Sequence, residues 1–264
     1  SFTTQDGLAS NGVRTICEDR EGHLWLGTIG GLSRYDGSTF VTFTARDGLA
    51  DTTIFSVIQD RRGDLWFGIR RGGVCRYDGR VFSTFTTQDG LVSNSVRKVF
   101  EDRAGCLWFC TQGGGVCRYD GQNFTSFTTE DGLAGNLVET IFQDREGQLW
   151  IATEAGLSRY DGQNFRTFTT EDGLAYDYVT AIYQDSRENL WFGCRHIGVS
   201  RYDGRNFATF ATADGLAGDG VAAICEDREG HLWFGTNGGG VSRYDGRSFA
   251  TFWCRWGWTR RFYP

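Results

Sequence analysis

The side chains best suited to bind a polar ligand are arginines, tyrosines and a histidine that interrupt an otherwise regular sequence. An arginine guanidinium donates paired hydrogen bonds to oxyanions, and a tyrosine offers a ring for stacking beside it. Together with neighbouring acids, these departures are Asp51, Arg70, Arg71, Glu154, Tyr176, Asp177, Tyr178, Arg195 and His196. They predict a binding site for a small anionic or sugar-like ligand. The alternatives are unconstrained surface variation, and arginines that form solvated ion pairs with Asp51, Asp177 and Glu154.

Enzymatic and metal chemistry have little support in the sequence. Two of the three histidines, His23 and His231, occupy equivalent positions, and no Ser/His/Asp set, pair of acids or phosphate-binding glycine loop stands out. No turn has the alternating aspartates of a calcium loop. The eight cysteines contain no C-x2-C pair, which favours free thiols and a reducing compartment. We therefore predict no catalytic residue, no metal and no cofactor.

Charge and hydropathy exclude two classes of partner. The formal net charge of −6 argues against nucleic acid or a membrane surface bound through bulk charge. No apolar run in this fragment approaches the length of a membrane span. The remaining partners are a small ligand or another protein.

The elements that must position these side chains come from a sequence repeat. The segment Leu24–Thr28, which contains Trp25, recurs five more times, and successive tryptophans are 41 or 42 residues apart. A fixed period of this size is typical of solenoids, propellers and arrays. The tryptophans are Trp25, Trp66, Trp108, Trp150, Trp191 and Trp233.

Each repeat contains four short segments rich in β-branched and aromatic residues, bounded by Gly and Asp. In the first repeat the expected strands are 13–17, 24–28, 32–35 and 39–44. Asp19-x-x-Gly22 fits a type I turn, and Asp36-Gly37 is a hairpin signal. The second strand is apolar on both faces, as in a sheet that lies between two others. Only a small residue is expected two positions after the tryptophan, where four repeats have Gly and the others Cys110 and Ala152.

These features predict an all-β fold, a six-bladed β-propeller with four antiparallel strands per blade. Residues 1–252 would form a single, closed, monomeric propeller of six repeats, and residues 253–264 an off-pattern aromatic and basic tail. A rival is a larger ring completed by another chain. In such blades the turns between second and third strands share one face with the loops between repeats. The second and fifth repeats, which hold most of the departures, would lie opposite one another.

The repeat closely resembles the two-component regulator propeller repeat. The residues that carry the resemblance are Asp6-Gly7-Leu8, Asn11-x-Val13, Glu18-Asp19-x-x-Gly22-x-Leu24-Trp25-x-Gly27-Thr28, Gly31-Leu32 and Arg34-Tyr35-Asp36-Gly37. The resemblance implies the ligand-sensing, periplasmic propeller of a bacterial hybrid sensor kinase. We therefore expect a non-catalytic recognition module. The alternatives are a structural or protein-interaction scaffold and, more distantly, an enzyme similar to the propeller lyases.

Overall fold

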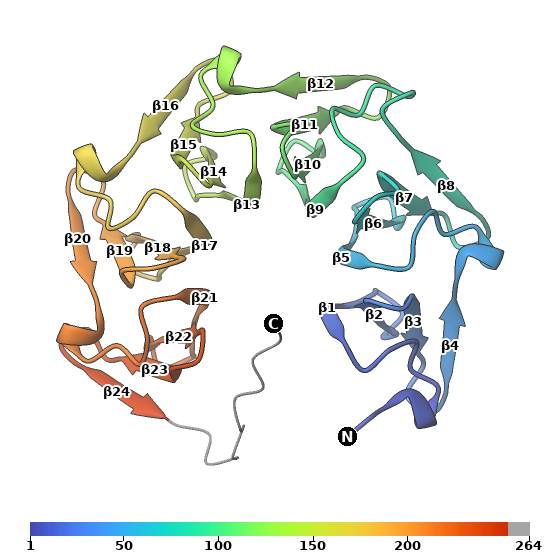
Figure 1. Cartoon of the computed structure of the whole chain (residues 1–264), viewed down its shortest axis with the longest axis horizontal. Helices are drawn as coiled ribbons and strands as arrows, with labels where there is room; N and C mark the ends of the chain where they lie inside the picture. The colour runs from blue at the N-terminus through green and yellow to red at the C-terminus, as the bar shows by residue number, and fades with distance from the viewer. Residues whose placement is uncertain (253–264) are drawn as a thin grey trace, which may run out of the picture. The chain divides into compact units, whose positions relative to one another are not determined.

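The computed structural model describes residues 1–252 and contains six four-stranded antiparallel sheets (Figure 1). In every sheet the strands follow one another in chain order, so each repeat supplies one complete blade. This confirms the predicted fold class, an all-β six-bladed β-propeller. The predicted tail, residues 253–264, lies outside the described residues.

The strands have the following bounds. The first sheet contains β1 (Val13–Glu18), β2 (Leu24–Thr28), β3 (Leu32–Tyr35) and β4 (Phe40–Phe43). The second contains β5 (Ile54–Gln59), β6 (Leu65–Ile69), β7 (Val74–Tyr77) and β8 (Phe82–Phe85). The third contains β9 (Val96–Glu101), β10 (Leu107–Thr111), β11 (Val116–Tyr119) and β12 (Phe124–Phe127).

The remaining sheets repeat this pattern. The fourth contains β13 (Val138–Gln143), β14 (Leu149–Thr153), β15 (Gly156–Tyr160) and β16 (Phe165–Phe168). The fifth contains β17 (Val179–Gln184), β18 (Leu190–Cys194), β19 (Val199–Tyr202) and β20 (Phe207–Phe210). The sixth contains β21 (Val221–Glu226), β22 (Leu232–Thr236), β23 (Gly240–Tyr244) and β24 (Phe249–Phe252).

The chain divides into two compact units. Unit 1 is Ser1–Phe168 and holds the first four sheets, while unit 2 begins at Thr169 and holds the fifth and sixth. Each unit is described by itself below. Closure of the six repeats into a single ring stays a prediction.

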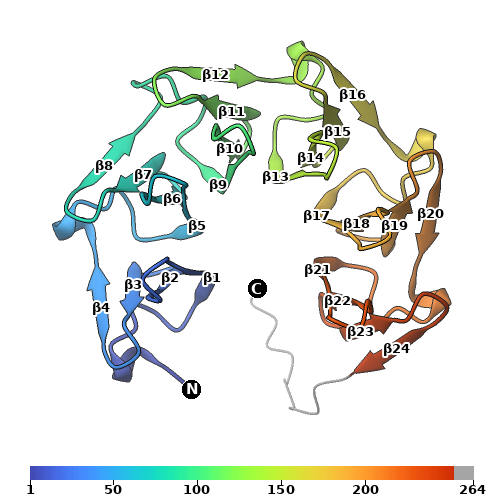
Figure 2. The same cartoon turned by 180° about the vertical axis from the view of Figure 1, so that it is seen from behind.

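Short 3-10 turns precede five of the sheets (Figure 2). In the first, Thr3 accepts a hydrogen bond from the Gln5 amide, Asp6 accepts from the Thr3 amide, and Gly7 ends the turn with a left-handed φ of 103°. These turns are η1 (Thr4–Asp6), η2 (Ala45–Asp47), η3 (Thr129–Asp131), η4 (Thr170–Asp172) and η5 (Thr212–Asp214). None of the helices among residues 1–252 is long and apolar enough to cross a membrane.

The hydrophobic core lies between consecutive sheets within each unit. Trp25 of the first sheet stacks on Phe43 and reaches Phe67 and Tyr77 of the second, with ring centroids 5.6 to 6.0 Å apart. A Cβ added at Gly27 would lie only 2.8 Å from a methyl of Ile54 in the second sheet. The close approach of the next sheet therefore explains the glycine two positions after the tryptophan at Gly27, Gly68 and Gly193.

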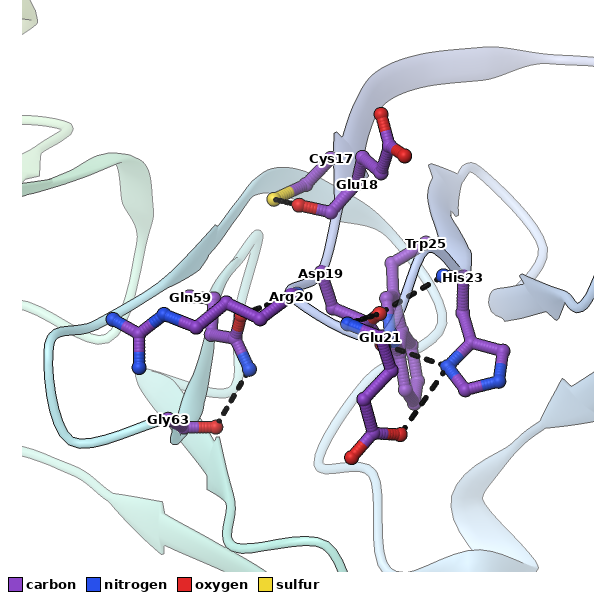
Figure 3. A network of polar contacts seen from close by, with 9 residues as sticks. All are labelled: Cys17, Glu18, Asp19, Arg20, Glu21, His23, Trp25, Gln59 and Gly63. Atoms are coloured by element: carbon purple, nitrogen blue, oxygen red, sulfur yellow. Dashed lines mark hydrogen bonds and ion pairs between the residues drawn. The ribbon is translucent and has the colours of Figure 1, made fainter.

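An aspartate in the turn between the first and second strands of each sheet anchors the tryptophan of the same sheet. Its Oδ2 accepts a hydrogen bond from the indole Nε1 at 2.7 to 2.8 Å in all six sheets. The same carboxylate also accepts turn amides, such as those of Glu21 and His23 at Asp19 (Figure 3). The pairs are Asp19–Trp25, Asp60–Trp66, Asp102–Trp108, Asp144–Trp150, Asp185–Trp191 and Asp227–Trp233.

Replacement of Trp150 by alanine tests the contribution of one anchored indole. Trp150 is 1% exposed, donates to Asp144 and stacks on Phe168. Trp150→Ala should lower the free energy of unfolding by about 3–5 kcal/mol, measured by urea unfolding, because it opens a cavity and leaves a buried carboxylate short of a donor. Ile29→Ala is the control, since that side chain is 49% exposed. Equal losses in the two variants would contradict this packing.

The indole also controls ionisation of its aspartate. The hydrogen bond from Trp233 lowers the pKa of Asp227 to about 2. Because ionisation is easier in the folded state, this group stabilises the fold above about pH 4, and the contribution is lost as the pH falls towards 2. Trp233→Phe should raise the pKa of Asp227 towards its ordinary value, as followed by carboxyl NMR. Asp245 is the internal control, because backbone amides of Ser248 and Arg247, and not an indole, lower its pKa. An unchanged pKa of Asp227 in Trp233→Phe would refute the role of the indole.

Candidate functional site

In every repeat the turn after the second strand is tied to the loop that enters the same sheet. The Ile29 amide donates to the Gly12 carbonyl at 3.1 Å, and the Arg70 amide donates to the Thr53 carbonyl at 3.1 Å. Equivalent bonds join 112 to 95, 154 to 137, 195 to 178 and 237 to 220. The predicted pairing of these two variable segments within each repeat is therefore correct, and we call this surface of a repeat its rim.

The fifth repeat, in unit 2, gathers four of the predicted site residues on one rim. The Arg195 guanidinium lies over the Tyr178 ring at 4.9 Å, while Tyr176 and His196 meet edge to face at 5.5 Å. Arg195 and His196 are exposed, and both tyrosines are half-buried. The cluster therefore presents a cation and an imidazole to solvent, backed by two aromatic rings.

The backbone of this turn contains an unusual residue. Ile197, beside His196, has a φ of 67° and is 48% exposed. The left-handed region is unfavourable for a β-branched residue, because its Cβ is crowded by the backbone. The equivalent residues in the second, third and sixth repeats, Gly72, Gly114 and Gly239, do not have a positive φ, so the left-handed backbone at this position is particular to the fifth repeat. Strain of this kind gathers at functional sites, which supports this rim as a binding surface.

The acidic residues predicted for the site hold their own loops. Asp177 Oδ1 accepts the Thr170 amide at 2.7 Å, the role that Asn11 plays for Thr4. Asp51 accepts the amides of Thr52 and Thr53, and Glu154 accepts the Leu137 amide at 3.0 Å. Among residues 1–252, no ion pair joins these acids to Arg70, Arg71 or Arg195.

The two arginines of the second repeat lie in unit 1. Arg70 and Arg71 are exposed on the same rim as Asp51, and Glu154 belongs to the fourth repeat. Unit 1 therefore holds Asp51, Arg70, Arg71 and Glu154, and unit 2 holds the other predicted residues. The expectation that the second and fifth repeats oppose each other stays a prediction.

The turns between first and second strands have a structural role. The Arg20 guanidinium donates to the carbonyls of Asp60 and Arg61, and its amide donates to Gln59 Oε1 at 2.9 Å. Gln59 in turn donates to the Gly63 carbonyl at 3.0 Å (Figure 3). Arg61 and Arg103 make the same guanidinium contact with the following turn. These bonds connect neighbouring sheets of unit 1.

Two clusters on these turns contain residue types that could ligate a metal, Asp19, Glu21 and His23 and their counterparts Asp227, Glu229 and His231. Figure 3 shows Asp19 beside Trp25 and His23. Asp19 Oδ2 already accepts the indole at 2.7 Å and contacts His23 Nδ1 at 3.1 Å. The carboxylate is thus used to anchor the tryptophan.

Five of the described thiols belong to the packing, while that of Cys17 is half-buried and that of Cys225 is exposed. All seven cysteines among residues 1–252 are free, as predicted. Burial raises the pKa of Cys194 to about 12 and raises that of Cys110 as well. A thiol that stays protonated is a poor nucleophile.

A further set of residues was missed by the sequence analysis. The first strand of every sheet contains a β-bulge at its second residue; in β1, for example, Val13 pairs with Thr28 and Thr15 with Gly27. A bulge leaves one residue outside the regular pairing and redirects its side chain. The bulged residues are Arg14, Phe55, Arg97, Glu139, Thr180 and Ala222.

A signal for these residues exists in the sequence. The residue directly before the bulged position and the residue two places after it are Val or Ile in every repeat, whereas the bulged position itself changes in both charge and size. In unit 1, four of the bulged residues line one cavity of about 370 Å³ with Val13. In unit 2 the Thr180 hydroxyl instead donates to the Val221 carbonyl at 2.6 Å.

Fold and site together define a β-propeller repeat protein with variable rims. The family model for the two component regulator propeller matches residues 7–30, 48–71, 90–113, 132–155, 173–196 and 215–238. Because these segments make up more than half of the chain, the chain belongs to the two component regulator propeller family.

Known proteins are similar to this chain in structure or in sequence. The extracellular domain of a B. thetaiotaomicron protein described as a hybrid two component system is 27% identical with a TM-score of 0.80, over 93% of this chain and 34% of that one. Virginiamycin B lyase from Staphylococcus aureus is similar in fold alone, at 15% identity and a TM-score of 0.71, over 93% of this chain and 85% of the lyase. A 40-residue segment is 50% identical to Histidine kinase P4 of Formosa agariphila, covering 15% of this chain and 3% of that protein.

Ile197 provides a test of the strained rim. Ile197→Asn should raise the free energy of unfolding by about 1 kcal/mol, because asparagine tolerates the left-handed backbone better than a β-branched residue. Ile29→Asn is the matched control, as Ile29 is similarly exposed on a rim but has no positive φ. Chemical unfolding of both variants measures the difference. A loss at position 197 as large as at position 29 would show that no strain is stored there.

Proposed function

We propose that this chain is a non-catalytic ligand-recognition propeller that serves as the sensing part of a bacterial two-component regulator. Membership of the propeller family supports this role, as does similarity to an extracellular domain described as part of a hybrid two component system. The chain spans about a third of that domain, so coupling to a kinase is part of the proposal.

The observation that carries the proposal is the cluster on the rim of the fifth repeat. Arg195 over Tyr178 and His196 against Tyr176 place two polar groups and two rings on one exposed surface. The acids of this repeat leave Arg195 available, since Asp177 accepts a loop amide. A guanidinium beside aromatic rings suits an anionic or sugar-like ligand, through bidentate hydrogen bonds and stacking.

Recognition without turnover is favoured over lyase chemistry. Similarity to the virginiamycin lyase at 15% identity extends to the fold only, and a fold alone does not carry an activity. His196 is the one histidine on the rims of residues 1–252, and its ring contacts Tyr176.

Calorimetric titration with a panel of uronates, sugar phosphates and neutral oligosaccharides tests the proposal. For a ligand bound by the wild-type chain, Arg195→Ala should weaken the affinity at least tenfold, about 1.4 kcal/mol. Arg166→Ala is the matched control, because Arg166 also lies over an aromatic ring, Phe168, but outside the rims.

A second pair of variants tests whether both predicted repeats contact the ligand. Arg70→Ala/Arg71→Ala should also weaken binding if the second repeat takes part, and leave it unchanged if the fifth repeat acts alone. Equal affinity in wild type and Arg195→Ala would place the site elsewhere. Absence of any binding across the panel would favour the scaffold alternative, in which the rims contact another protein.

A further inference from the structure

The cavity in unit 1 is formed by the first strands of four successive sheets. Val13, Arg14, Phe55, Arg97 and Glu139 line a volume of about 370 Å³, and they come from β1, β5, β9 and β13. Figures 1 and 2 show these four strands in succession along unit 1. A volume of this size is within the range of small-molecule sites.

The two arginines of this cavity differ in their partners. Arg14 lies over the Phe55 ring at 5.1 Å, and no carboxylate among residues 1–252 forms an ion pair with it. Arg97 donates from a terminal nitrogen to Glu139, but its Nε is buried without a hydrogen-bond partner. Arg14 therefore offers an unpaired guanidinium, and Arg97 one unused donor.

The orphan nitrogen of Arg97 is unlike the others in the described chain. The other buried arginine Nε atoms without a partner share one position of the repeat, on the third strands, and are those of Arg34, Arg118, Arg201 and Arg243. Arg97 is the one of these arginines that lies at a bulge; it lines the cavity of unit 1, whereas Arg201 lines a separate cavity in unit 2. Because a buried donor without a partner is unfavourable, an acceptor that reaches this atom would be bound favourably.

The charge and shape of the lining specify the ligand class. Two guanidiniums and the Glu139 carboxylate leave one net positive charge, which suits a monoanion and disfavours a dianion such as phosphate. Phe55 and Val13 supply an apolar wall. We infer that this cavity binds a small monocarboxylate with a flat apolar body, its carboxylate held by Arg14 and Arg97.

The bulges explain how such a site can exist on a repeat scaffold. A bulged residue has no residue directly opposite it on the partner strand, so its side chain can change without a cross-strand neighbour to match. The inference is independent of the proposed rim site, which lies in unit 2 and shares no residue with this cavity.

Calorimetric titration with benzoate tests the inference, with benzamide as the neutral control. The wild-type chain should bind benzoate saturably and benzamide at least tenfold more weakly. Arg14→Gln should lower the benzoate affinity at least tenfold, and Arg14→Lys by less, because charge is kept while the fork is lost. Arg166→Gln is the matched control, as Arg166 lies over Phe168 at 4.6 Å in the same unit but on β16.

A variant of the opposite sign separates binding from folding. Glu139→Gln removes the negative charge that competes for Arg97, so it should strengthen benzoate binding several-fold while thermal unfolding reports its stability. In NMR spectra the Nε–Hε signals of Arg14 and Arg97 should shift on addition of benzoate, and that of Arg166 should not.

Three outcomes would overturn the inference. They are no saturable benzoate binding by the wild-type chain, unchanged affinity in Arg14→Gln, and weaker binding in a folded Glu139→Gln variant. Loss of benzoate binding in Arg195→Ala with retention in Arg14→Gln would assign benzoate to the rim instead. That result would support the proposed function and refute the cavity site, so the two can fail separately.

Discussion

The hydrogen bond between an aspartate and an indole, made once in each of the six sheets, is the contact on which the structure depends. The carboxylate accepts hydrogen bonds from amides of the turn between the first and second strands and from the indole of the second strand. Through that indole it is also linked to the hydrophobic core between this sheet and the next. Asp102 and Trp108, for example, are both buried. The Trp108 Nε1 atom lies 2.8 Å from Asp102 Oδ2, and the indole stacks on Phe127. A buried hydrogen bond to a charged group contributes about 1.5–3 kcal/mol. This contact therefore fixes the turn and the sheet packing together.

Much of the fold could be predicted because local chemistry determines it. The second and third strands of the first repeat, Leu24–Thr28 and Leu32–Tyr35, have the predicted bounds, since Asp-x-x-Gly and Asp-Gly turns leave little freedom in where a strand begins. The first strand is one residue longer than expected and the fourth is shorter at both ends. The bulges and 3-10 turns escaped prediction, because a register shift depends on the partner strand and on caps that span the loop.

The candidate site was predictable in its surface but less so in its members. Pairing of turns with loops follows from blade topology, and Arg195, His196 and the two tyrosines do share one rim. Asp177 was misinterpreted as a departure, although it occupies the position of Asn11, Asn94 and Asn136 and accepts the same amide. The bulged residues were overlooked because a strand with alternating polarity draws attention to its apolar positions.

The same bulge in every repeat has an evolutionary consequence. Each repeat carries one residue, at the bulge, whose side chain has no directly opposite cross-strand neighbour to match. Near-identical copies recombine readily at the level of whole repeats. Shuffling such units would bring new combinations of Arg, Phe, Glu, Thr and Ala together without redesign of the scaffold. Binding preference in this architecture would then diversify by recombination: duplication supplies the repeats, and their order along the chain determines which bulged residues line the pocket.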